Sequence, residues 1–358
     1  MSTPYHDFDA ALLATVLATP SAIPVIVGPC GGGRTTMLHR LRQRLPPASC
    51  QYVALDRVVS TPERFLAEVA ATSAFRWTRP GAAPSGPREA FDSLLNYLAH
   101  ARTASGEPAT FLLDEFLELK TFEHFPGLRQ VVPMTLATIA TSANRFVLST
   151  RFVSRMLGDL RDAPDRFTVM HVPRLADSDV AADVLALPGF RSDSAEEAAR
   201  VVVALTSGRP GYVADLLKIL GDPAERNRDA VSAFVAGMAP GGGIARRCRL
   251  SYEFRLHRAR GYGALKAILG ILSEEEPANL TEIALRMQRT PGSTKDYLGW
   301  LEDVDLVACH RKRYTIADPV LRLWATLHTQ CDAPDEARVV DMVQRYALGR
   351  LSAVTPRP

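Results

Sequence analysis

The chain has 358 residues, of which 47% are hydrophobic, and a formal net charge of +3. This length allows two or three domains with cores of their own, and the composition excludes a fibrous or generally disordered protein. The five cysteines are scattered and form no Cys-x-x-Cys pair. That pattern favours reduced thiols in a cytoplasmic protein over a disulfide or zinc framework.

Residues 10–33 carry no charged side chain, so they need a check as a membrane segment. Pro20 and Pro24 interrupt the stretch, Asp7 and Asp9 precede it, and no basic segment stands in front of it. These features favour a short helix followed by a buried strand, and we expect no membrane contact.

Short apolar runs alternate with helix-length segments between residues 23 and 173. Runs without polar alternation are typical of strands buried on both faces of a parallel sheet. The expected strands are Ile23–Val27, Tyr52–Leu55, Thr110–Leu113, Phe146–Ser149 and Phe167–Val172, and the expected helices include Thr35–Leu45, Pro62–Ala71, Arg88–Ala101 and Leu128–Ala143. The alternation predicts an α/β fold that binds ligands at the carboxyl ends of its strands.

Helical patterns replace the strands after residue 176, and a Gly/Pro cluster at 240–243 is typical of a linker. Three helices and a hairpin follow, which is the order of a winged helix: Ala264–Leu272, Leu280–Met287, Thr294–Leu301, then Leu306–Cys309 and Arg313–Ile316, with a further helix from Pro319. We therefore predict a nucleotide-binding α/β domain (1–175), a helical lid (176–240), a winged helix (244–330) and a C-terminal helix and tail (331–358).

The segment GPCGGGRTT, residues 28–36, follows the first expected strand and opens a helix. That is the context of a G-x-x-x-x-G-K-[ST] phosphate loop, in which glycines let successive N–H groups point at phosphates and the helix adds its positive end. Thr35 is placed to give a hydroxyl to Mg²⁺. The predicted phosphate-binding residues are Gly28, Gly31, Gly32, Gly33, Arg34, Thr35 and Thr36.

Arg34 stands where such loops have lysine. Its planar fork keeps the charge but cannot sit as a compact ammonium between phosphates. The backbone N–H groups of the loop can still surround the phosphates with Arg34 in place of lysine, so we expect nucleotide binding. Whether the nucleotide is hydrolysed is left open. A Gly-rich turn without a ligand is the competing interpretation.

An apolar strand ending in Asp114 and Glu115 lies about 80 residues further on. We expect Asp114 to hold the Mg²⁺ shell and Glu115 to act as general base. At the end of the next strand, Ser149 or Thr150 is placed to sense the γ-phosphate, unless either serves only to cap the strand. Arg166 is our candidate for a finger that reaches a neighbouring subunit, with Arg151, Arg155 and Arg161 as alternatives; a surface arginine is the competing interpretation for each.

This order of motifs resembles the prokaryotic AAA+/STAND P-loop ATPases, and within them the archaeal-type ATPase group. Two later blocks strengthen the resemblance: TSGRPGY at 206–212 is similar to the Gly-x-Pro turn of the lid, and YTIADPVLRLW at 314–324 to the end of the winged helix. The resemblance implies a P-loop NTPase sheet with a helical lid and winged helix. It also implies an ATP-driven, Mg²⁺-dependent switch that assembles into homo-oligomers, with Arg209 and Pro210 reading the nucleotide from the lid.

The winged helix offers Lys295 on its second helix and Arg311, Lys312 and Arg313 on its hairpin. We expect these cations to contact DNA phosphates, although a solvated turn or a protein partner also fits them. Three functions follow: an ATP-hydrolysing switch, a module that binds ATP without turnover, or a DNA-binding regulator or loader controlled by nucleotide.

Overall fold

A computed structural model describes residues 6–18, 22–58, 60–78, 83–223, 229–256, 261–329 and 334–354. The chain separates into two compact units. The sheet unit comprises Tyr5–Pro29 and Gly33–Pro173, and the helical unit comprises Cys30–Gly32 and Arg174–Pro358. Among the described residues, no helix is both long and apolar enough to cross a membrane.

The sheet unit contains a five-stranded parallel sheet in the order β2-β3-β4-β1-β5. The strands are β1 (Ile23–Val27), β2 (Cys50–Ala54), β3 (Thr110–Asp114), β4 (Arg145–Thr150) and β5 (Phe167–His171). All five expected strands form, with ends shifted by a residue or two. Every residue of β1 and β3 is buried, which explains why these runs lack polar alternation.

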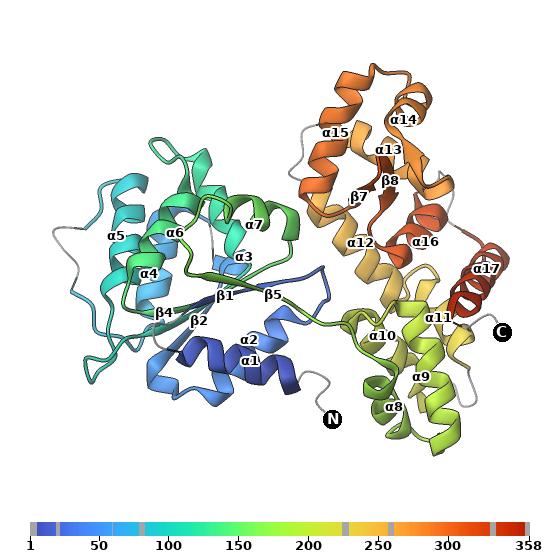
Figure 1. The fold of residues 1–358 in the computed structure, drawn as a ribbon, viewed down its shortest axis with the longest axis horizontal. Helices are drawn as coiled ribbons and strands as arrows, with labels where there is room; N and C mark the ends of the chain where they lie inside the picture. The colour runs from blue at the N-terminus through green and yellow to red at the C-terminus, as the bar shows by residue number, and fades with distance from the viewer. Residues whose placement is uncertain are drawn as a thin grey trace. The chain divides into compact units, whose positions relative to one another are not determined.

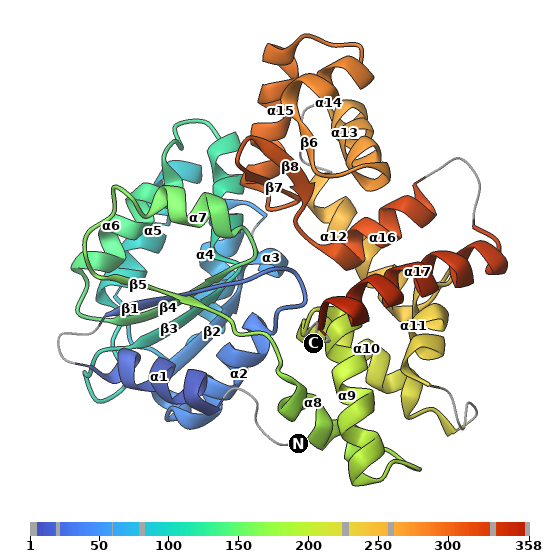
Figure 2. The same ribbon diagram turned by 45° about the vertical axis from the view of Figure 1, so that its right-hand side comes forward.

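Helices cover both faces of this sheet (Figures 1 and 2). One face is covered by α1 (His6–Leu17) and α2 (Arg34–Arg44), and the other by α4 (Pro62–Ala71), α5 (Pro87–His100) and α6 (Val131–Thr141). The short elements η1 (Pro47–Ser49), α3 (Leu55–Val58), η2 (Phe116–His124) and α7 (Val153–Asp159) connect them. The predicted α/β layers are therefore confirmed.

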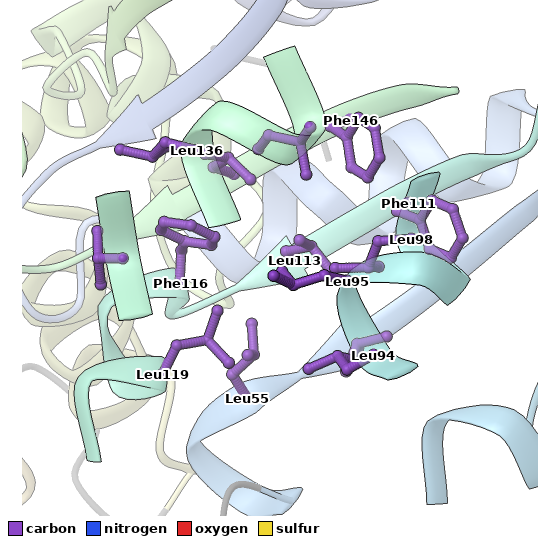
Figure 3. Close-up of a cluster of buried hydrophobic side chains, with 14 of the residues drawn as sticks. Leu55, Leu94, Leu95, Leu98, Phe111, Leu113, Phe116, Leu119, Leu136 and Phe146 are labelled. Carbon is purple, nitrogen blue, oxygen red and sulfur yellow. The ribbon is translucent and has the colours of Figure 1, made fainter. Parts of the chain in front are cut away.

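The core on the α4–α6 face centres on aromatic rings (Figure 3). Phe111 of β3 stacks on Phe146 of β4 with centroids 5.4 Å apart, and meets the edges of Phe75 and Tyr97. Since successive side chains of a strand alternate in direction, Leu112 points to the opposite face. Packing of the helices on both faces of the sheet thus holds the carboxyl ends of β1, β3 and β4 beside one another.

The helical unit begins with α8 (Asp177–Leu185), α9 (Ser192–Thr206), α10 (Pro210–Leu220) and α11 (Ala230–Met238), followed by α12 (Gly243–Leu256). The Gly/Pro cluster expected to be a linker forms a tight turn between α11 and α12. A Cβ on Gly242 would lie 2.4 Å from the carbonyl oxygen of Gly237, so only glycine fits there.

The rest of this unit contains α13 (Tyr262–Glu274), β6 (Ala278–Asn279), α14 (Leu280–Arg286), α15 (Pro291–Asp303), β7 (Val307–His310), β8 (Arg313–Ile316), α16 (Pro319–His328) and α17 (Glu336–Val354). The strands form an antiparallel sheet in the order β6-β8-β7. Asn279 and Glu282 cap the start of α14 reciprocally, and Thr290 caps α15. The expected helices and hairpin form in the expected order, while the division of this unit into lid, winged helix and tail stays a prediction.

Replacing Phe111 tests the core that holds the strand ends. We expect Phe111→Ala to lower the free energy of unfolding by about 3–5 kcal/mol, because it removes a fully buried ring and leaves a cavity. Phe111→Leu keeps most of the volume and should cost less than about 1.5 kcal/mol. Urea unfolding measures both, and equal losses in the two variants would contradict the assignment.

Candidate nucleotide site

The candidate site lies where three neighbouring strands of the sheet unit end. Asp114 is the last residue of β3, Ser149 and Thr150 end β4, and the loop after β1 leads into α2. Because β3, β4 and β1 are adjacent and parallel, their carboxyl ends share one edge of the sheet. The loop after β1 and the Asp114–Glu115 pair, which lie about 80 residues apart in the sequence, are thus brought to the same edge of the sheet.

The loop backbone has the conformations that a phosphate loop needs. Gly33 precedes α2 with φ of 91°, and Gly31 has φ of 72°, both in the left-handed region that favours glycine. A Cβ on Gly28 would approach Val172 to 3.4 Å, so the start of the loop has little spare room. Thr36 is exposed in the first turn of α2 and Gly32 is buried. These conformations fit main-chain amides wrapped around an anion at a helix start.

Asp114 accepts hydrogen bonds from hydroxyl groups. Thr35 Oγ1 and Tyr52 Oη each lie 2.8 Å from Asp114 Oδ2, and Ser149 Oγ donates to Asp114 Oδ1. Among the described residues no cation pairs with this carboxylate. Hydroxyl and carboxylate oxygens are the donors that Mg²⁺ prefers, so Asp114 and Thr35 fit the ion.

Tyr52 is a site residue that the sequence analysis missed. Burial and the hydrogen bond to Asp114 raise the pKa of Tyr52 well above its ordinary value, so the phenol stays protonated and donates. Its ring lies 4.6 Å from the ring of His39 on α2. The sequence shows only that Tyr52, a side chain with a polar tip, stands in an apolar strand. Its partner Asp114 is far away in the chain, so the sequence does not reveal their contact.

Arg34 is folded back onto its own loop. Its Nη1 donates to the carbonyl oxygens of Gly28 and Pro29, and its Nη2 lies 2.5 Å from Glu115 Oε1. The side chains of Arg34 and Glu115 are only 6% and 8% exposed. The planar fork thus holds two loop carbonyls with one nitrogen and a carboxylate with the other, a spacing that the compact ammonium of lysine does not have.

Glu115 is buried and surrounded by positive charge and donors. Besides Arg34, the backbone N–H of Arg151 donates to Oε2 at 3.1 Å, and Arg151 Nε lies 3.8 Å from the same oxygen. The Glu115 backbone is in the left-handed region, with φ of 56°, and its N–H donates to Ser149 Oγ at 3.2 Å. This conformation is costly for a non-glycine residue, and here it aims the carboxylate at both arginines.

Further groups complete the surroundings of the acidic pair. Arg151 also binds Glu118 Oε1 at 2.5 Å, so its guanidinium bridges two carboxylates. Burial, together with the negative charge of Glu115, raises the pKa of Asp56 in α3. The bridging role of Arg151 was not predicted, although Arg151 was one of the finger alternatives.

Thr150 and Arg166, two of the predicted catalytic residues, make structural contacts, and their catalytic roles stay predictions. Thr150 Oγ1 accepts from the backbone N–H of Phe152 at 3.2 Å, as a strand-end cap does. Ser149, the other sensor candidate, donates to the Asp114 carboxylate and accepts from the backbone N–H of Glu115. Arg166 Nη1 donates to the carbonyls of Ala140 and Ser142 at the end of α6, at 2.8 and 2.7 Å. A finger role for Arg166 stays a prediction, and these contacts do not favour it.

The predicted lid residues lie in the helical unit. Arg209 Nη1 is 2.7 Å from Asp318 Oδ2, which also accepts from Tyr212 Oη at 2.8 Å. Asp318 Oδ1 caps α16 by accepting from the N–H of Val320. Pro210 is the first residue of α10. These contacts form a buried polar cluster around Asp318, which gives the sequence block at 314–324 a structural role. Nucleotide sensing by Arg209 stays a prediction.

The predicted nucleic-acid residues are exposed. Lys295 lies on α15, and Arg311 and Lys312 form the two-residue turn between β7 and β8. Arg313 is partly occupied, because its Nη1 donates to the carbonyl of Pro277 at 2.9 Å and lies 3.9 Å from Glu282.

No protein-family model matches the sequence, and no curated protein matches it. Among solved structures, the Walker-type ATPase PABY2304 of Pyrococcus abyssi superimposes with a TM-score of 0.60 at 16% identity, over 90% of this chain and 95% of that one. The chain has the P-loop NTPase fold. A RuvB variant of Thermotoga maritima is less similar, with a TM-score of 0.43 at 16% identity over 87% of this chain and 90% of that one.

Removing Glu115 should destabilise the ligand-free P-loop protein. We expect Glu115→Ala to cost about 3–5 kcal/mol, because it leaves the buried Arg34 without its counterion. Glu68→Ala, which removes an exposed carboxylate of α4, should change stability by about 0.5 kcal/mol or less. Urea unfolding without nucleotide measures both variants, and similar midpoints for them would show that the ion pair does not form.

Proposed function

We propose that the protein is a nucleotide-dependent switch that binds ATP with Mg²⁺ and hydrolyses it slowly while Arg34 holds Glu115. The observation that carries the proposal is the 2.5 Å ion pair between Arg34 and Glu115 inside a P-loop site. The same guanidinium is the positive charge of the loop, so a triphosphate and Glu115 compete for it.

The two carboxylates have different surroundings, which supports different roles. Asp114 accepts hydrogen bonds from hydroxyl groups and has no cationic partner in the described part of the chain. A divalent cation would therefore neutralise its charge. Glu115 is already neutralised by Arg34 and Arg151. Bound Mg²⁺ would supply charge neutralisation for the phosphates, and Thr35 and Asp114 would hold it.

Glu115 would orient and deprotonate the attacking water once Arg34 has left it. A general base needs a free carboxylate oxygen to reach the water, and here Oε1 accepts from Arg34 Nη2 and Oε2 from the backbone N–H of Arg151. Release of Arg34 to the phosphates would therefore link binding to activation. Ser149, which accepts from the N–H of Glu115 and donates to Asp114, would keep the two carboxylates in register.

Replacing Arg34 tests this competition. Arg34→Lys removes the fork that joins loop and carboxylate, so we expect steady-state phosphate release to rise by about tenfold or more. Glu115→Gln should lower turnover by roughly 10²–10⁴-fold while ATP binding remains. Parallel measurement of binding and phosphate release distinguishes the effects.

The same ion pair favours a second function, in which the protein binds ATP without turnover and ATP acts as a stabilising ligand. This is the better description if wild-type protein binds Mg-ATP, turns over no faster than Glu115→Gln, and does not gain activity in Arg34→Lys. Absence of Mg-ATP binding would refute both functions.

We further propose that the β7–β8 hairpin contacts duplex DNA. Arg311 and Lys312 have φ of 50° and 63°, the left-handed conformation of a type I′ turn that favours Asn-Gly. Keeping two long cations there costs about 1–2 kcal/mol per residue. A local cost at an exposed turn supports a function for the charges, and phosphate contact is what exposed Arg and Lys provide.

The double variant Arg311→Asn with Lys312→Gly should move stability and DNA binding in opposite directions. The turn becomes favourable, so the free energy of unfolding should rise by about 1 kcal/mol. Affinity for random-sequence duplex DNA should fall, with the slope of log K against log salt reduced by about 2.

Arg200→Gln with Lys218→Gln removes the same charge from exposed positions of α9 and α10, and should leave DNA affinity unchanged. A salt dependence that is flat in the wild type would exclude phosphate contact. In that case a protein partner is the remaining ligand for the hairpin.

A further inference from the structure

A cavity of about 830 Å³ lies between α12, α13 and α16 of the helical unit. The three helices are neighbours in both views (Figures 1 and 2). The volume falls within the range of roughly 300–1,000 Å³ that is typical of small-molecule sites. None of the nucleotide-site or hairpin residues lines it.

Positive charge is in excess around this cavity. Three cations line it, Arg246, Arg249 and Lys266, against one carboxylate, Glu253. Glu253 is already engaged, because Lys266 Nζ lies 3.2 Å from one of its oxygens and Tyr262 Oη lies 2.7 Å from the other. Arg246 and Arg249 are three residues apart on α12 and so share a face of the helix. In the described part of the chain, neither guanidinium forms a hydrogen bond or an ion pair.

The ring of Tyr252 forms part of the cavity wall, and its hydroxyl is buried away from the open space. Tyr252 is 1% exposed, and its Oη has no hydrogen-bond partner among the described residues. Its ring is fixed by Trp324, with centroids 5.2 Å apart, and by Lys266, whose Nζ lies 5.6 Å from the ring centre. A water molecule cannot reach the hydroxyl, so Tyr252 fixes the cavity wall and does not extend a polar group into the cavity.

Small residues keep the cavity open. Gly270 of α13 lines it, and a Cβ built on Gly270 would meet no atom within 4 Å. Glycine in a helix interior is unfavourable compared with other residues, so its place here is not explained by helix formation. The space in front of Gly270 and the nearby Ala267 gives room for the apolar part of a ligand.

We propose that this cavity binds a small organic phosphomonoester. A phosphomonoester carries a charge of about −1.5 to −2 at pH 7, which matches the excess of two positive charges, whereas a monocarboxylate leaves half of it unbalanced. Arg246 and Arg249 bind the phosphate oxygens, as guanidinium groups do well. The wall at Ala267 and Gly270 packs against the organic part of the ligand.

AMP and adenosine test the proposal on the full-length protein. The indole N–H signals of Trp77, Trp300 and Trp324 are followed by NMR, with Trp324 assigned from a Trp324→Phe variant. AMP should move the signal of Trp324, which lines the cavity, and adenosine should bind about tenfold more weakly or worse because it lacks the phosphate.

Two variants show that AMP binds in this cavity. Gly270→Leu places a side chain where a Cβ meets no atom within 4 Å, and it should weaken AMP binding by about tenfold or more while Mg-ATP binding is unchanged. Tyr252→Phe is the matched control: it should leave AMP binding unchanged because the hydroxyl is buried away from the cavity, while stability stays the same or rises because the hydroxyl has no bond to lose. An unmoved Trp324 signal at about 1 mM AMP, where even a millimolar ligand fills half its sites, overturns the proposal. Equal binding of adenosine, or AMP binding that survives Gly270→Leu, also overturns it.

Discussion

The buried charge of Arg34 is the constraint on which the nucleotide site depends. A guanidinium that is 6% exposed must have partners inside the protein, since an unpaired buried charge costs several kcal/mol. It finds them in two carbonyls of its own loop and in Glu115. Arg34, which would bind phosphate, therefore also closes the loop. Glu115, which would activate water, serves as the counterion of Arg34.

The neighbouring carboxylates have different surroundings, which supports the different roles proposed for them. Asp114 and Glu115 are consecutive, yet one faces hydroxyl groups and the other faces two arginines. A continuing strand would point the two side chains to opposite faces of the sheet, whereas the left-handed backbone of Glu115 ends the strand and lets its carboxylate reach Arg34 at the same edge. A cation is thus favoured beside Asp114 and disfavoured beside Glu115.

Local patterns predict the fold of the sheet unit well and the site only in part. Strands such as β1 and β3 follow from uninterrupted apolar runs, and the loop glycines follow from spacing. The partners of Arg34 do not, because a long side chain has many rotamers and its choice depends on packing. Tyr52 and Arg151 were missed for the same reason: each reaches a residue far away in the chain. Their backbone positions were predictable, and their contacts were not.

In this chain, the residues whose burial or backbone conformation is unfavourable are the ones that point most directly to function. Arg34 is such a position, but Glu115 offsets its burial, so the conflict is resolved within the protein. The Arg311–Lys312 turn is different, since no contact in the described residues offsets its cost. A natural sequence that keeps a local cost without an internal gain indicates a gain from outside. That reasoning separates the Arg34–Glu115 pair, whose cost is offset inside the protein, from the Arg311–Lys312 turn, whose cost supports the proposed contact with a ligand.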